Sequence, residues 1–185
     1  FSDSSAVPTY HVSRLARRHV TVALAGDGGD EAFGGYRRYL FDVRENATRR
    51  FLPRFAWRTL GALYPKADWL PRPLRAGTLL ENLGRDEATA YYSDLSFLKP
   101  ADVRRLLGQT PSRDPATSPV YAAVTDAYRR CGSTDALQRA EYADLKVYMP
   151  NDPLVKVDRM SMAHSLEVRC PLLDRRVVEL AFRIP

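Results

Sequence analysis

Three carboxylates stand among glycines in the stretch GDGGDEAFGG, which spans residues 26–35. They are Asp27, Asp30 and Glu31, and five of the ten glycines in the chain lie in the same stretch. Carboxylate oxygens are ligands that suit Mg²⁺, and the backbone N–H groups of a glycine-rich loop can meet phosphate oxygens. The pattern is typical of a site for a metal-bound phosphate, although a tight turn with solvated acids would have the same composition. The GxxxxGKS/T and GxGxxG patterns do not occur, which excludes the usual P-loop and dinucleotide-binding sites.

Basic side chains in a second segment could balance the charge of such a phosphate. Lys156 and Arg159 are three residues apart in LVKVDRMSMAHSLE, so a helix would present both on one face. Cations at this spacing can stabilise a leaving polyphosphate. The alternative is an ordinary i,i+4 ion pair between Asp152 and Lys156. His164 has no second histidine or cysteine at ligand spacing, so we interpret it as a packing residue.

The acidic loop follows an apolar run, VTVALA at residues 20–25, which predicts a buried strand. Ligands of parallel sheets bind beyond the carboxyl ends of strands, and glycines permit positive φ and close approach of the backbone to a ligand. A helix is expected before the strand, with an N-cap at Asp3, Ser4 or Ser5. The order of helix, strand and loop indicates an α/β layer.

Most of the remaining chain has helical periodicity. Helices are expected over residues 37 to about 52, 81–98, 99–109, 118–131 with Ser118 as N-cap, 134–149 with Thr134 as N-cap, 152 to about 167 with Asp152 as N-cap, and 174–181. Short elements are expected from Pro53 to Pro73, and a turn-rich linker over residues 109–119. The chain is therefore mostly α with one clear strand. A lone strand has no ladder partner, so we infer that it has lost its neighbours and that the chain is a fragment of something larger.

Composition narrows the class of protein. The chain has 185 residues, a formal net charge of +6 and 45% hydrophobic residues, which is ordinary for a globular domain with one core. No apolar run approaches the ~20 residues of a membrane span, and the first residues lack a secretory signal, which predicts a cytoplasmic location without a membrane partner. Acids are interspersed with the basic residues, which disfavours a nucleic-acid surface but keeps it as an alternative. Cys131 and Cys170 indicate neither a disulfide framework nor a zinc site, and we expect two buried free thiols.

Three motifs, in this order and spacing, resemble the synthetase domain of the glutamine-hydrolysing asparagine synthetases. They are DSSAVPTY, VTVALAGDGGDEAFGGYRRY and YMPNDPLVKVDRMSMAHSLEVRCPLLD, and only the helical middle is weakly characterised by them. The resemblance implies that residues 1–185 are part of an α/β domain of the ATP pyrophosphatase type, similar to the adenine nucleotide alpha hydrolases. The family's SGGxDS phosphate loop and its N-terminal glutaminase domain are missing from this sequence, so the resemblance implies that this chain alone is inactive.

The resemblance also implies a reaction. The family's domain activates the side-chain carboxylate of aspartate as β-aspartyl-AMP with release of pyrophosphate, and ammonia derived from glutamine then displaces AMP. The implied cofactors are ATP and Mg²⁺, and the implied partners are aspartate, ammonia and the glutaminase domain of the same protein. The alternatives are a family member that amidates another carboxylate, such as a cell-envelope or natural-product precursor, and a non-catalytic helical interaction module. A homodimer is an open alternative for the oligomeric state.

Individual residues receive roles from the same resemblance. Asp27 falls where a Glu or Asp is tied to adenylate formation, and Asp30 falls where the family has its magnesium ligand. Lys156 and Arg159 would face pyrophosphate, although some members carry lysine where Arg159 stands. The loop residues that would lie against the nucleotide are Ala25, Gly26, Gly28, Gly29 and Glu31. Ala25 departs from the family, which usually has serine there.

Overall fold

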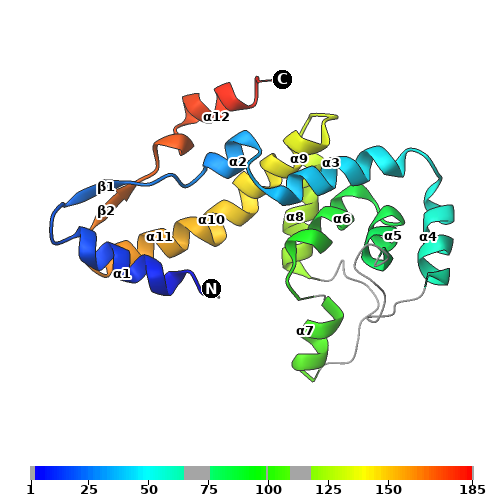
Figure 1. Cartoon of the computed structure of the whole chain (residues 1–185), viewed down its shortest axis with the longest axis horizontal. Helices are drawn as coiled ribbons and strands as arrows, with labels where there is room; N and C mark the ends of the chain where they lie inside the picture. The colour runs from blue at the N-terminus through cyan, green and yellow to red at the C-terminus, as the bar shows by residue number, and fades with distance from the viewer. Residues whose placement is uncertain (1–2, 65–75, 99, 109–117, 185) are drawn as a thin grey trace. The chain divides into compact units, whose positions relative to one another are not determined.

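The fold is that of a computed structural model of the chain (Figure 1). The structure describes residues 3–64, 76–98, 100–108 and 118–184. The chain divides into two compact units. We call the unit formed by residues 3–36 and 141–184 the sheet unit, and the described part of residues 37–140 the helical unit. No helix in these described ranges is both long and apolar enough to cross a membrane.

The sheet unit is built on two short parallel strands, β1 (Val22–Leu24) and β2 (Glu167–Arg169), which lie side by side in Figure 1. Helix α1 (Ala6–Ala16) packs against α11 (Pro153–Met162), and α11 also contacts β2. The other elements of this unit are α2 (Gly29–Phe33), the π-helical turn η3 (Asp144–Tyr148), α10 (Met149–Asn151), the 3₁₀ turn η4 (Pro171–Leu173) and α12 (Arg175–Ala181).

Strand β2 corrects the expectation of a single strand without a ladder partner. The helical pattern was expected to continue to about residue 167, but α11 ends at Met162. Ser165 then adopts φ 55°, a left-handed conformation that turns the chain into β2. Because β2 has only three residues, it is too short to produce a detectable alternation of apolar and polar side chains. The strand predicted at residues 20–25 is confirmed but is shorter, and its partner lies within the chain. The expectation that the strand is buried is wrong, because Val22 is 39% exposed and Leu24 is 73% exposed.

The helical unit contains no strand among its described residues. Its elements are α3 (Arg37–Arg49), α4 (Arg54–Leu63), α5 (Gly77–Leu83), α6 (Glu87–Leu95), α7 (Pro100–Leu106) and α8 (Pro119–Arg130), and α9 (Ala136–Ala143) continues from it into the sheet unit. The described chain is thus mostly helical with two parallel strands, as the predicted fold class requires.

Two local expectations for the helical unit change, and a third is confirmed. Residues 81–98 were expected to form one helix, but the helix breaks after Leu83, and Asp86 caps α6 by accepting a hydrogen bond from the Thr89 N–H at 3.3 Å. The Ser118 cap of α8 is confirmed. Asp135, rather than Thr134, accepts from the first turn of α9. Residues 109–117 of the linker expected over 109–119 lie outside the described residues, as do residues 65–73 of the short elements expected from Pro53 to Pro73. Helix α4 confirms one short element in the described part of that stretch.

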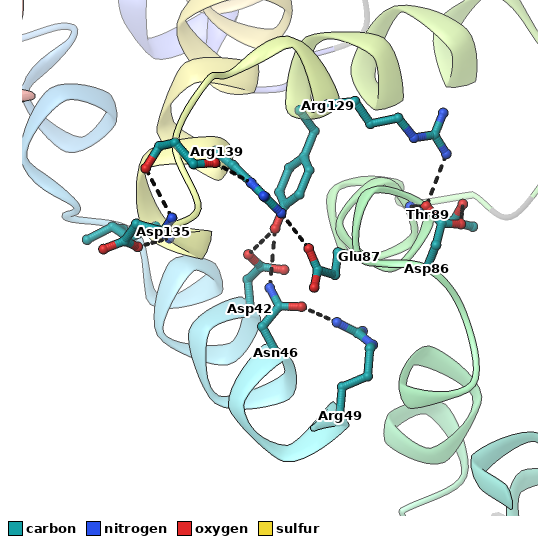
Figure 2. Close-up of polar contacts among 12 residues, drawn as sticks. Asp42, Asn46, Arg49, Asp86, Glu87, Thr89, Arg129, Asp135 and Arg139 are labelled. Carbon is teal, nitrogen blue, oxygen red and sulfur yellow. Dashed lines mark hydrogen bonds and ion pairs between the residues drawn. The ribbon is translucent and has the colours of Figure 1, made fainter. Parts of the chain in front are cut away.

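A buried polar network joins α3 to α8 in the core of the helical unit (Figure 2). The Tyr128 hydroxyl donates to Asp42 Oδ2 at 3.1 Å and accepts from Asn46 Nδ2 at 3.2 Å. Arg49 donates to the Asn46 side-chain oxygen and, at 3.1 Å, to the backbone carbonyl of Asn82. Because buried polar groups are costly unless they are hydrogen-bonded, this network fixes how the helices of the unit pack.

Burial changes the acidity of two carboxyls on α3. Asp42 is 1% exposed, and burial raises its pKa to about 7 against the opposing hydrogen bond from Tyr128. Burial and the charge of Asp94 raise the pKa of Glu45 to about 7, although Arg49 opposes this shift. A carboxyl with a raised pKa binds its proton more tightly in the folded chain. The stability that it contributes is therefore complete below about pH 4 and is lost as the pH rises to about 7.

We expect Asp42→Asn to flatten the fall of stability between pH 4 and pH 7, because the amide cannot ionise. The slope of the free energy of unfolding against pH should decrease by up to about 1.4 kcal/mol per pH unit. Urea unfolding followed by tryptophan fluorescence measures this in the helical unit, since Trp57 lies in α4. Asp126→Asn, which changes an exposed carboxylate of α8, should keep the original slope. An unchanged slope in Asp42→Asn would contradict the prediction.

Candidate functional site

A cleft of about 300 Å³ lies in the sheet unit, directly after the carboxyl end of β1. It is lined by Gly26, Asp27, Gly28, Asp30, Glu31, Tyr36, Tyr148, Pro153 and Lys156. Parallel pairing of β1 with β2 and packing of α1 on α11 bring these distant parts of the sequence together. The acidic loop and Lys156 thus line the same cleft, as expected for a phosphate site.

Glycines shape the acidic loop for packing as well as for access. Gly28 has φ 91°, and a Cβ atom at this position would lie 2.3 Å from Leu173 Cδ2. The Gly29 N–H donates to the Gly26 carbonyl at 3.2 Å, which closes a turn just before α2, and Gly34 ends α2 with φ 68°. The expected positive φ values are therefore confirmed. The close approach that Gly28 permits on its Cβ side is made to Leu173 of η4.

The three carboxylates of the loop have different surroundings. Glu31 is 2% exposed and accepts a hydrogen bond from the Tyr36 hydroxyl at 2.8 Å. Asp30 is exposed, whereas Asp27 is half-buried. Burial and the nearby charge of Asp27 raise the pKa of the Cys170 thiol. Glu31 is therefore used partly in holding the loop, which leaves Asp27 and Asp30 as the better candidates for binding a cation.

Two backbone donors of the loop have partners inside the protein. The Ala25 N–H donates to the Arg169 carbonyl at 2.9 Å and extends the strand ladder, and the Gly29 N–H closes the turn on Gly26. Neither group is available to a phosphate. Fewer backbone N–H groups than expected can therefore bind a phosphate, because Ala25 and Gly29 cannot contribute theirs.

The donor set of the cleft fits Mg²⁺ only when it is shared with a ligand. Within the described ranges, no three His, Cys, Asp or Glu side chains gather closely enough to hold a metal by themselves. Mg²⁺ usually keeps several waters and binds through one or two carboxylates together with substrate phosphates. Asp27 and Asp30 both line the cleft and supply oxygen donors of this kind. The site is suited to a metal that arrives with a phosphate.

Lys156 brings a positive charge to the wall of the cleft. Its side chain is 16% exposed, and its Nζ atom lies 2.9 Å from Asp3 Oδ2 and 2.8 Å from Ser5 Oγ. The ion partner is Asp3 in place of the expected Asp152, which occupies the N-cap position of α11 without a side-chain cap bond. Arg159 is exposed and is not one of the lining residues, so the structure brings only the first of the two expected cations to the cleft.

Neighbouring residues clarify other expectations. His164 packs on Tyr10 with ring centroids 4.3 Å apart, which agrees with its interpretation as a packing residue. Both cysteines are free thiols, but each is half-buried, so the expectation of full burial is wrong.

Tyr36 and Tyr148 line the cleft without having been singled out in the sequence. A tyrosine shortly after an acidic loop is the one signal that could have identified Tyr36, and Tyr148 has none.

Comparison with known proteins gives one consistent result. The family model described as Asparagine synthase matches residues 1–185. The chain is 35% identical over 190 residues to a putative asparagine synthetase (glutamine-hydrolyzing) of Mycobacterium tuberculosis, with 100% of this chain and 27% of that protein covered. It is 34% identical over 185 residues to asparagine synthetase (glutamine-hydrolyzing) 1 of Bacillus subtilis, with 100% of this chain and 28% of that protein covered.

A shorter match has higher identity. A putative asparagine synthetase (glutamine-hydrolyzing) 2 of Methanocaldococcus jannaschii is 51% identical over 65 residues, which is 35% of this chain and 12% of that protein. No solved structure matches the chain. The chain thus spans little more than a quarter of the length of the relatives that match all of it.

We expect Gly28→Ala to lower the free energy of unfolding by roughly 1–3 kcal/mol, because the new Cβ atom would collide with Leu173 at a positive φ. Chemical denaturation followed by far-UV circular dichroism measures the loss. Gly26→Ala is the matched control, since a Cβ atom there meets nothing within 4 Å. Adding Leu173→Ala to Gly28→Ala should recover part of the loss. Equal losses from the two glycine variants would contradict the packing role of Gly28.

Proposed function

The chain belongs to the asparagine synthase family, and from this premise we propose that it forms the phosphate-handling part of an ATP-dependent ligase that converts a carboxylate into an amide. The observation that carries the proposal is the meeting of the acidic loop and Lys156 in one cleft. We propose aspartate as the carboxylate, glutamine-derived ammonia as the nitrogen donor, and asparagine, AMP and pyrophosphate as products. The names of the relatives support this choice of substrates.

The proposed reaction has two steps. A carboxylate oxygen attacks the α-phosphorus of ATP, a new oxygen–phosphorus bond forms, and the bond to pyrophosphate breaks. Ammonia then attacks the acyl carbon, loses a proton, and the bond to AMP breaks. The first step leaves additional charge on pyrophosphate, so a site that accelerates it must supply positive charge near the leaving group.

Residues of the cleft are suited to that requirement. Asp27 and Asp30 would hold Mg²⁺ together with phosphate oxygens, and the metal would neutralise phosphate charge. Lys156 places an ammonium at the same cleft, where it would stabilise departing pyrophosphate. We propose that Arg159, one turn further along α11, contacts the outer end of the polyphosphate. Its exposed position leaves the side chain able to reorient toward a ligand.

The remaining loop residues would contribute to nucleotide binding without each donating a backbone N–H group to the phosphates. A Cβ atom at Gly26 would meet nothing within 4 Å, so the backbone there is open to a ligand. Ala25, Gly28 and Gly29 would position this segment, and Glu31 would keep it in place through Tyr36. We propose that ammonia is supplied by a glutaminase domain in parts of the full-length protein outside this chain. The chain spans only 27–28% of the length of the relatives that match all of it.

We expect Asp30→Ala in the full-length protein to lower AMP and pyrophosphate release by at least about 100-fold, because the phosphates would lose a metal ligand. The assay supplies Mg·ATP, aspartate and either glutamine or ammonia. Asp126→Ala, an exposed acid on α8, should retain the original rate. Turnover that depends on aspartate and is lost in Asp30→Ala would support the proposal.

Other outcomes distinguish the alternatives. Turnover of a different carboxylate, still lost in Asp30→Ala, would redirect the substrate to a cell-envelope or natural-product precursor. Failure of the full-length protein to release AMP with any carboxylate would contradict the enzymatic proposal and favour the interaction module.

A further inference from the structure

The Lys156 ammonium is held by a closed set of hydrogen bonds at the start of α1. Lys156 Nζ donates to Asp3 Oδ2 at 2.9 Å and to Ser5 Oγ at 2.8 Å, across 153 and 151 residues of sequence. Ser5 in turn donates to Asp3 through its hydroxyl at 2.7 Å and its backbone N–H at 2.8 Å. Each group therefore has a distinct role: Lys156 only donates, Asp3 only accepts, and the Ser5 hydroxyl does both.

This arrangement restricts a side chain that is otherwise mobile. An ammonium has three N–H donors on a flexible four-carbon stem, and the loss of rotamer entropy opposes its immobilisation. Two of the donors of Lys156 are directed to Asp3 and Ser5, which leaves the third to point elsewhere. Lys156 lines the cleft, whereas Asp3 and Ser5 do not, so the two anchors hold the ammonium from outside the cleft.

The anchors themselves are fixed. Helix α1 packs along α11, the helix that carries Lys156 (Figure 1). Hydrogen bonds from Ser5 and Lys156 lower the pKa of Asp3 to about 2. Asp3 is therefore a carboxylate throughout the pH range in which an ATP-dependent enzyme works. The negative charge that anchors Lys156 therefore does not change with pH in that range.

We propose that Asp3 and Ser5 are positioning residues that orient the Lys156 ammonium toward the phosphate-binding cleft. This inference rests on the proposed function, because it takes a polyphosphate as the ligand that the third N–H of Lys156 meets. Without the anchors the lysine side chain would sample several rotamers, and its charge would be only partly available to departing pyrophosphate.

The test uses the full-length protein and two readouts: kcat for AMP release and the inhibition constant of added Mg·pyrophosphate. In Asp3→Asn, kcat should fall and the inhibition constant should rise, each by about tenfold, as expected for the loss of one hydrogen bond to a charged group. The KM for the carboxylate substrate should change less than about twofold, since the proposal places Lys156 at the polyphosphate. Ser5→Ala should act in the same direction, and Ser5→Thr, which keeps the hydroxyl, should restore most of the loss.

A double-mutant cycle separates positioning from a merely structural role. In a Lys156→Gln background, Asp3→Asn should change neither readout by more than about twofold, because the group that it positions is gone. Asp135→Ala is the control for general destabilisation, since it removes the side-chain acceptor of the Leu137 N–H at the start of α9, and Asp135 does not line the cleft. It should lower the melting temperature without changing either readout.

Three results would overturn the proposal. If Lys156→Gln raises the inhibition constant but Asp3→Asn and Ser5→Ala do not, the anchors do not position the lysine, and the proposed function stands. If the losses from Asp3→Asn and Lys156→Gln are additive, the role of Asp3 is structural. If Lys156→Gln has no effect on pyrophosphate inhibition while Asp30→Ala abolishes turnover, Lys156 does not meet the polyphosphate. If Asp3→Asn does not fold, the pair Ser5→Ala and Ser5→Thr gives the same decision.

Discussion

The parallel pairing of β1 with β2 is the constraint on which the sheet unit depends. Val22 lies opposite Glu167 and Leu24 opposite Arg169, and the Ala25 N–H extends the ladder to the Arg169 carbonyl. Two strands of three residues are too short to be stable alone, so packing of α1 and α11 must support them. The pairing places the carboxyl end of β1 beside the carboxyl end of β2, the strand that follows α11. Without it, the acidic loop and the basic helix would not share a cleft.

Charge in the cleft is divided between groups that hold the protein together and groups that remain suited to a ligand. Glu31 is tied to Tyr36, and Lys156 is tied to Asp3, so one acid and one base of the site have partners in the fold. Asp27 and Asp30 complete the lining as oxygen donors. This division is consistent with the proposal that the loop would bind a metal together with a phosphate rather than alone. A cluster of three cation ligands would not need that help.

The sequence predicts much of the fold because several signals are local. The glycine-rich acidic loop, the strand before it, the Ser118 cap and Pro153 at the start of α11 all depend on neighbouring residues. Strand β2 could not be predicted, because its three residues are defined by pairing with β1 rather than by their own pattern. The family resemblance correctly identified the membership of the chain, but no sequence spacing connects Asp3 with Lys156 across 153 residues. That contact requires the packing of α1 on α11.

The central claim is that the acidic loop and Lys156 form one polyphosphate site, and its most direct test is a crystal structure of the full-length protein with Mg²⁺ and pyrophosphate. We expect the metal to contact Asp30, the pyrophosphate to lie in the cleft between Gly26 and Lys156, and Lys156 to keep its bonds to Asp3 and Ser5. Well-ordered pyrophosphate bound elsewhere, with the cleft filled only by solvent, would contradict the account.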